Sequence, residues 1–432
     1  MLKRKIITVF EEWKQQPKKK ALLVKGARQV GKSTSISEWA KDHYKNVITI
    51  NFIERPDATK AFEGALNTKT IIRELSLLGF GHFVEHETLI FFDEIQMCPN
   101  ARTAIKFLVQ DGKFDYIESV SLLGINYKDV KSYPVGFEQQ VDMFQLDFEE
   151  YLWAKNVEAD AIAYVKNCFD KKEPVAATTH ESLMKHFREY LFVGGMPSVV
   201  VKALANPDIS VAIAEQKDIL TSYRDDISKY AESEKTLAKA MFDAIPAQLA
   251  KPIKRFILSD IEKGATANKY KDAIQWLVDA GIAHQCFCLS ALELPLDFMA
   301  KRNLYKVYLD DTGLLCAETM NGIQKAIMDG DLTINEGSIT ENAVASLLVA
   351  TGKQLFYYDK NSRSEVDFVI KDGNRVSIIE VKSGRDYKKH ACIDKARDVF
   401  GKQISNCYVL SKNNVQVEGG VIYLPLYMAM FL

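Results

Sequence analysis

The chain has 432 residues, of which 56 are basic and 57 acidic, and a formal net charge of −1. This length predicts several domains, and the charge balance excludes a globally basic nucleic-acid binder, although it leaves room for a local basic patch. No apolar run approaches the ~20 residues that a membrane helix needs, so no membrane partner is expected. Seven scattered cysteines fit neither a disulfide framework nor a zinc site, which favours the cytoplasm.

A glycine-rich segment near the start of the chain carries the first functional signal. Residues 21–24 (ALLV) predict a buried strand and residues 35–44 (SISEWAKDHY) a helix, and between them lies KGARQVGKST. This is the pattern GxxxxGK[ST], in which backbone N–H groups and a lysine hold phosphates while a hydroxyl ligates magnesium. We therefore predict a site for ATP and Mg²⁺. Its nucleotide-binding residues are Gly26, Ala27, Arg28, Gln29, Val30, Gly31, Lys32, Ser33 and Thr34.

Two acids follow an apolar strand predicted over residues 89–92. A phosphate-binding loop needs such an acid to position magnesium. We predict that Asp93 belongs to the nucleotide site and holds the metal together with Ser33. Glu94 is predicted to be the catalytic residue that orients or deprotonates the attacking water.

Further strands are predicted over residues 47–52 and 116–124. A polar residue at the end of the second of these strands is placed to sense the γ-phosphate. Ser119 and Ser121 are both candidates, and the sequence does not decide between them.

Residues 156–230 alternate helical patterns with short breaks such as GGMP, which predicts a helical lid on the ATPase. Within SYRDDISKY, Arg224 is a candidate arginine finger for a neighbouring subunit. The alternative is an ion-paired helix residue, and we favour it.

A winged-helix order is predicted for residues 231–325. Helices expected over 235–250, 253–264 and 267–281 precede a strand-like segment, and Lys269 and Lys271 lie at the start of the third helix. That position suits contact with DNA. Packing against a partner domain explains the same pattern equally well.

The C-terminal hundred residues carry acids on a predicted hairpin, RSEVDFVIKDGNRVSIIEVKSG. A two-residue turn at 372–373 places Asp367 opposite Ile378 and diagonal to Glu380, on one face with Lys382. Two carboxylates in this arrangement suit a hard cation, and the lysine suits activation of water. We predict Asp367, Glu380 and Lys382 as catalytic residues, in a pattern that resembles the PD-(D/E)xK nucleases.

A helix predicted over residues 337–352 places Glu341 beside an apolar face. We predict Glu341, Asp367 and Glu380 as ligands of a second metal. The alternative is a hairpin on which Glu380 and Lys382 form an ion pair and no metal binds.

The phrases GARQVGKST, FFDEIQ, SYPVGFEQQVDMFQLDFEEYLWA and YLFVGGMPSVV together resemble the prokaryotic AAA-type ATPases of uncharacterised function. In that family an N-terminal ATPase is fused to a C-terminal domain with a restriction-endonuclease-like core. The resemblance implies an α/β chain in four parts. These are a P-loop NTPase (AAA-type) domain over 1–155, a helical lid over 156–230, a winged-helix-like domain over 231–325 and a PD-(D/E)xK nuclease-like α/β domain over 326–432.

The expected function is ATP hydrolysis, with ATP and Mg²⁺ as cofactors, coupled to DNA binding or processing by the nuclease-like domain. A protein of another class competes: an ATP-dependent regulatory or signalling switch whose C-terminal domains bind a protein partner or a second copy of the chain and do not cut. Metal-dependent nicking that is lost on changing Glu380 separates the two.

Overall fold

The structure is a computed structural model that describes residues 2–121, 133–230, 235–320, 322–329, 336–360, 365–384 and 386–432. It divides into two compact units, one made chiefly of residues 4–145 and the other chiefly of residues 146–278 and 282–432. The helices expected to form a lid on the ATPase therefore belong to the same unit as the C-terminal sheet. Residues 122–124, at the end of one expected strand, lie outside the described residues.

The first unit, which we call the nucleotide unit, alternates strands with helices. In chain order its elements are α1 (Ile6–Lys14), β1 (Ala21–Gly26), α2 (Lys32–His43), β2 (Asn46–Asn51), η1 (Pro56–Phe62), α3 (Thr68–Leu77), β3 (Thr88–Asp93), η2 (Ile95–Met97), α4 (Pro99–Asp111), β4 (Asp115–Ser121) and β5 (Glu138–Asp142). This order is typical of an α/β fold with a parallel sheet.

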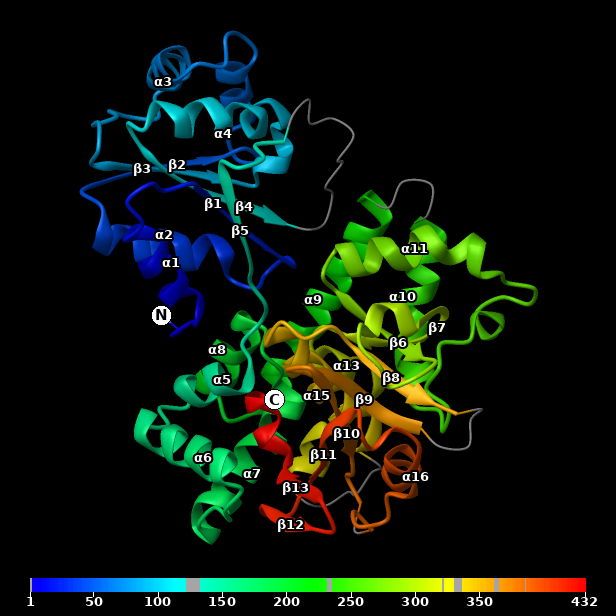
Figure 1. Ribbon diagram of the computed structural model, residues 1–432. Coiled ribbons are helices and arrows are strands. Elements are labelled where there is room, and N and C mark those ends of the chain that lie inside the picture. The colour runs from blue at the N-terminus through cyan, green and yellow to red at the C-terminus, as the bar shows by residue number, and fades with distance from the viewer. Residues whose placement is uncertain are drawn as a thin grey trace. The chain divides into compact units, whose positions relative to one another are not determined.

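A parallel sheet with the strand order β2-β3-β4-β1-β5 forms the centre of the nucleotide unit. Helices α3 and α4 cover one face and α1 and α2 the other (Figure 1). All residues of β3 are buried because both faces of the sheet are covered. The carboxyl ends of β1, β3 and β4 meet at one edge, where the phosphate-binding loop and both predicted acids lie.

The second unit, which we call the C-terminal unit, begins with helices and ends in a sheet. Its elements are α5 (Phe148–Ala154), α6 (Ala159–Lys171), α7 (Ala177–Val193), α8 (Pro197–Ala205), α9 (Ile209–Tyr230), α10 (Lys235–Leu249), η4 (Leu258–Asp260), α11 (Ala267–Asp279), β6 (Ala283–Leu289), α12 (Leu296–Met299), β7 (Ala300–Leu309), α13 (Thr312–Thr319), α14 (Gln324–Asp329), α15 (Gly337–Ala350), β8 (Phe356–Asp359), β9 (Glu365–Asp372), β10 (Arg375–Val381), α16 (Ala391–Phe400), β11 (Ile404–Ser411), β12 (Gln416–Glu418), β13 (Val421–Pro425) and η5 (Leu426–Phe431).

The sheet of the C-terminal unit is mixed and has the order β12-β13-β11-β10-β9-β8-β6-β7. Strands β6 and β7, expected as the wing of a winged helix, form one end of this sheet because β6 pairs in parallel with β8. The boundary expected at 325/326 therefore divides a hydrogen-bonded sheet. Local sequence patterns do not reveal this pairing, because β6 and β8 are far apart along the chain.

The helix expected over residues 253–264 does not form, and its only regular element is the short turn η4. The backbone groups of this segment bond elsewhere. Phe256 N donates to Tyr305 O of β7 at 2.8 Å, and Ile257 exchanges hydrogen bonds with the side chain of Gln248. The expectation was wrong because these tertiary partners replace the helical hydrogen bonds. The second of the three helices expected in the winged-helix order is therefore missing.

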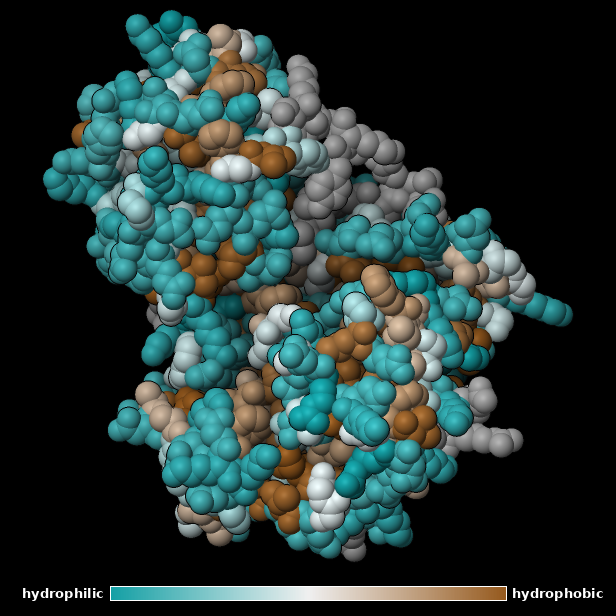
Figure 2. Space-filling model, viewed as in Figure 1, coloured by the Kyte–Doolittle hydropathy of each residue, from teal (hydrophilic) through white to brown (hydrophobic). Residues whose placement is uncertain are grey.

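Hydrophilic residues cover most of the face shown in Figure 2, and apolar residues appear on it in small separate groups. Large exposed apolar side chains such as Leu77, Val135 and Phe298 belong to different elements. Within the described ranges, no helix combines the length and apolar character that spanning a membrane requires.

Candidate functional site

The phosphate-binding loop connects β1 to α2 through a tight backbone path. Gly31 has φ 94° and Gln29 has φ 66°, both in the left-handed region. At Gly26 there is no room for a side chain, because a Cβ atom would lie 2.2 Å from Met143 O. Helix α2 begins at Lys32 with no side-chain cap, so its N-terminus remains available to an anion.

Lys32 is buried inside this loop, with 5% of its surface exposed. Its Nζ donates to Gly26 O at 3.0 Å and to Ala27 O at 2.7 Å. Burial lowers the pKa of Lys32 to about 8, although the nearby Glu94 and Asp93 favour the charged form. A buried ammonium at a helix N-terminus is a partner for phosphate oxygens, so this loop fits a nucleoside triphosphate.

Asp93 ends β3 and is the centre of a hydrogen-bonded group at the sheet edge. Ser33 Oγ donates to Asp93 Oδ1 at 2.8 Å, and Ser119 Oγ donates to the same oxygen. Asn51 Nδ2, at the end of β2, donates to Oδ2 at 2.9 Å. The predicted magnesium residues Ser33 and Asp93 are thus in direct contact, and a hydroxyl beside a carboxylate fits a hard cation.

Glu94 follows Asp93 with φ 56°, a left-handed conformation that is rare for a residue with a side chain. Its Oε1 accepts a hydrogen bond from Ser121 Oγ at 2.7 Å, and its Oε2 accepts one from Gln96 Nε2. The hydroxyls of the two serines considered as sensors therefore donate to different carboxylates, Ser119 to Asp93 and Ser121 to Glu94. Ser119 Oγ also accepts a hydrogen bond from Glu94 N at 3.2 Å. Both oxygens of the predicted catalytic carboxylate are oriented by neighbours.

The remaining predicted nucleotide residues contribute in different ways. Ala27 and Val30 are buried in the core, so only their backbone faces the loop, whereas Thr34 is exposed. Two residues that contact this site were not predicted from the sequence. Arg4 donates to Val30 O at 2.8 Å and so braces the loop, and Asn51 orients Asp93. The position of Asn51 at the end of a predicted strand was the available signal.

The pKa of Lys32 predicts a pH dependence of ATP binding. Bound phosphates raise this pKa above its value of about 8 in the free site, so binding takes up a proton at higher pH. Affinity should be constant below pH ~8 and fall by up to about tenfold per pH unit above it. Calorimetry between pH 7 and 9.5 measures this, and Lys32→Arg should flatten the curve because arginine stays charged. Equal wild-type affinity at pH 7 and 9.5 contradicts the prediction.

A second group of predicted residues lies on the hairpin of β9 and β10. The turn is at residues 373–374, because Asp372 pairs with Arg375 and Phe368 with Ile379. The turn expected at 372–373 was therefore wrong by one residue, which shifts the register by two positions and leaves each side chain on its face. Asp367, one residue before Phe368, comes directly opposite Glu380 instead of diagonal to it.

The carboxylates of this group are paired with lysines. Lys382 Nζ lies 2.6 Å from Glu380 Oε1, and Cys392 Sγ donates to Glu380 Oε2 at 3.2 Å. Asp367 Oδ2 accepts a hydrogen bond from Val381 N at 2.8 Å. In the part of the chain that the structure describes, no group of three or more His, Cys, Asp or Glu side chains is arranged to hold a metal ion.

Glu341, predicted as a further metal ligand, is buried on α15. It accepts hydrogen bonds from Lys306 Nζ at 3.0 Å, from Lys254 and from the hydroxyl of Tyr308. Burial opposes ionisation of Glu341, yet the two lysines lower its pKa to about 2. Sequence patterns did not reveal these lysines, because Lys306 comes from β7 and Lys254 from the segment expected to be helical.

Two cationic residues of the middle segment form ion pairs. Arg224 donates from Nε to Asp243 and from Nη2 to Glu318, both at 2.9 Å. This agrees with the favoured alternative to an arginine finger. Lys269, at the start of α11, lies 2.6 Å from Glu262.

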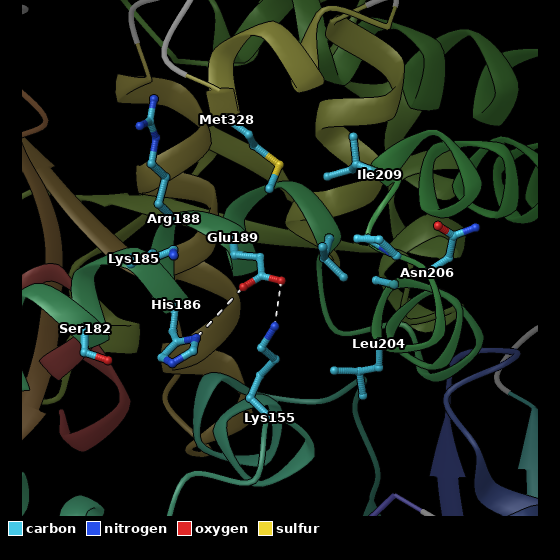
Figure 3. Close-up of a pocket in the computed structure, with 13 residues that line it drawn as sticks. Lys155, Ser182, Lys185, His186, Arg188, Glu189, Leu204, Asn206, Ile209 and Met328 are labelled. Atoms are coloured by element: carbon cyan, nitrogen blue, oxygen red, sulfur yellow. Dashed lines mark hydrogen bonds and ion pairs between the residues drawn. The ribbon is translucent and has the colours of Figure 1, made fainter.

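A cavity of about 630 Å³ lies beside α7 in the C-terminal unit. In Figure 3, Glu189 forms ion pairs with Lys155 and His186, with N–O distances of 2.9 and 3.9 Å. The contact with Lys155, the residue that follows α5, joins the end of that helix to α7, whereas His186 lies on α7 itself. None of the predicted site residues lines this cavity.

Three segments of the chain match known protein families. Residues 18–152 match a family described as an AAA domain, residues 184–325 a domain of unknown function (DUF8612), and residues 336–428 another (DUF4143). No curated protein matches the sequence.

Among solved structures, the chain is similar to a Walker-type ATPase of Pyrococcus abyssi, with 14% identity, 74% of this chain and 96% of that chain covered, and a TM-score of 0.46. It is also similar to the ORC1 protein of Aeropyrum pernix in complex with DNA (12%, 75% and 92%, 0.27). The RuvB Holliday junction branch migration motor of Thermotoga maritima is a third (13%, 65% and 87%, 0.26). All three TM-scores are below 0.5, so the likeness of whole chains is weak.

The parallel sheet, the phosphate-binding loop and the acids at the end of β3 define the nucleotide unit as a P-loop domain. Together with the family match, they identify residues 18–152 as an AAA-type ATPase domain.

Proposed function

We propose that the chain is a Mg²⁺-dependent ATPase whose nucleotide state controls the binding or processing of DNA by its C-terminal unit. The observation that carries the first part is the contact of Ser33 with Asp93 at 2.8 Å beside the buried ammonium of Lys32. An ammonium that suits phosphate, a hydroxyl beside a carboxylate that suits a hard cation, and a second, oriented carboxylate lie there at one sheet edge. The cytoplasm, with its reduced thiols, remains the expected location.

The residues of the nucleotide site would have three different roles. Lys32 would leave the carbonyl oxygens of Gly26 and Ala27 to bind the β and γ phosphates. Ser33 and Asp93 would hold Mg²⁺, which when bound neutralises charge on the phosphate oxygens. Glu94, held by Ser121 and Gln96, would orient the attacking water and accept its proton.

The arrangement of Asp367, Glu380 and Lys382 supports the DNA part of the proposal. Two acids lie on paired strands, with a lysine two residues beyond one of them, and these are the residue types that a nuclease-like interpretation requires. We infer that this constellation marks a nuclease-like domain. Helix α11, which carries Lys269 and Lys271, would add contacts to DNA phosphates.

A second candidate function is a regulatory switch that binds a protein partner or another copy of the chain and does not cut. The pairing of lysines with Glu341 and Glu380 favours it, because ion pairs stabilise a domain without any catalytic role. The two candidates differ in what should change the ATPase rate.

The separating experiment measures ATP hydrolysis and DNA affinity together. If DNA is the partner, adding double-stranded DNA should change the ATPase rate several-fold. Changing Lys269 and Lys271 to Ala should then make the negative slope of log affinity against log salt shallower, by ~0.9 for each phosphate that the variant no longer binds. Lys239→Ala, on the exposed side of α10, is the matched control. If DNA does not change the ATPase rate and the Lys269 and Lys271 substitutions do not change the salt slope, the regulatory switch is favoured.

A further inference from the structure

Each predicted metal ligand of the C-terminal unit has a lysine partner. Lys306 Nζ lies 3.0 Å from Glu341 Oε1 and 4.0 Å from Asp367 Oδ1. Lys382 Nζ lies 2.6 Å from Glu380 Oε1. The carboxylates that would ligate a divalent ion therefore already face positive charge from the chain itself.

Lys306 is the centre of this group. It comes from β7, none of its side chain is exposed, and it also lies 2.5 Å from Glu365. Its ammonium thus contacts three carboxylates that come from α15 and β9. A buried ammonium is costly unless such partners surround it, so the group is built around the lysine.

The net charge of the group disfavours the binding of an added divalent ion. Its members are four acids (Glu341, Glu365, Asp367 and Glu380) and three lysines (Lys254, Lys306 and Lys382), which gives a net charge of −1. A divalent ion would reverse this charge to +1 inside a buried site.

We propose that the ammonium of Lys306 takes the place of a divalent cation in the nuclease-like constellation, so that this site binds no divalent metal while Lys306 is present. The inference rests on the nuclease-like interpretation proposed above. The residue at position 306 would then control whether the site binds a divalent metal. Without Lys306 the net charge would be −2, which matches one divalent ion.

The test measures thermal stability of the full chain with and without Mn²⁺, in the absence of ATP. All variants carry Asp93→Asn so that the nucleotide site does not contribute metal binding. This background chain should show no Mn²⁺-dependent rise. Adding Lys306→Met should lower the melting temperature of the C-terminal unit and create a rise of ~5–10 °C at Mn²⁺ ~100-fold above its Kd. Further adding Asp367→Asn should remove that rise.

The control is Lys301→Met, which removes the same charge from an exposed position on β7 and should create no metal response. A Mn²⁺-dependent rise in the background chain that disappears with Asp367→Asn overturns the proposal, because metal and Lys306 would then coexist. The proposal is also overturned if Lys306→Met folds and binds no Mn²⁺. If that variant folds only with Mn²⁺, the proposal is supported. None of these outcomes depends on ATP hydrolysis or DNA, so they stand apart from the proposed function.

Discussion

Lys32→Ala should weaken ATP binding about 100-fold or more. The change removes the buried ammonium that would contact two phosphates, and charge-assisted hydrogen bonds of this kind contribute ~1.5–3 kcal/mol each. Because 1.4 kcal/mol is about tenfold in Kd, two such contacts account for the expected loss. Isothermal titration calorimetry with ATP and Mg²⁺ measures it directly.

Glu94→Gln should act on a different step. The amide keeps the size of the side chain and its contact with Ser121, so ATP affinity should stay within about threefold. Turnover should fall by ~10²–10⁴, because the amide does not accept the proton of the attacking water. The matched control for both variants is Lys41→Ala on the exposed face of α2, where the lysine pairs with Glu38. Unchanged ATP affinity in Lys32→Ala would remove the loop assignment, and unchanged turnover in Glu94→Gln would remove the catalytic one.

Asp311→Ala should destabilise the C-terminal unit by about 3–5 kcal/mol. Asp311 is 2% exposed and caps α13 by accepting from Leu314 N at 2.9 Å, while its other oxygen accepts from Gly195 N at 2.6 Å. Removing the carboxylate leaves two buried N–H groups without their acceptor, each at a cost of about 1–3 kcal/mol. The GGMP turn packs closely against Asp311, because a Cβ atom on Gly194 would lie 2.2 Å from Asp311 Oδ1.

Asp311→Asn is the matched variant, because it keeps one acceptor oxygen and should cost less than half as much. Burial raises the pKa of Asp311 to about 6, above its unfolded value of 3.8, so the folded state takes up a proton as the pH falls. Wild-type stability should therefore rise relative to Asp311→Asn between pH 7 and 4. Urea unfolding followed by circular dichroism measures both effects. Added ATP distinguishes unfolding of the nucleotide unit from unfolding of the C-terminal unit, because a ligand stabilises only the unit that binds it. Equal stability of Asp311→Ala and wild type contradicts the argument.

The sequence by itself predicted where a nucleotide site would lie, since phosphate chemistry requires particular residue types at fixed short spacings. The loop from Gly26 to Ser33 and the acids Asp93 and Glu94 could be assigned because each follows an apolar strand, and parallel strands bring their carboxyl ends to one edge. The side-chain face of Asp367 also followed from the alternation of a strand, even though the turn was placed one residue early.

Tertiary structure decided what surrounds those residues. The capping of α13 by Asp311 joins the GGMP turn to a segment more than a hundred residues later, and β6 joins the C-terminal sheet instead of forming a separate wing. Lys254 reaches Glu341 because its segment gives its backbone hydrogen bonds to other elements. Such partners are chosen by packing between distant segments, which local periodicity does not encode. Whether the carboxylates of the C-terminal unit face a metal or a lysine was therefore decided by the fold.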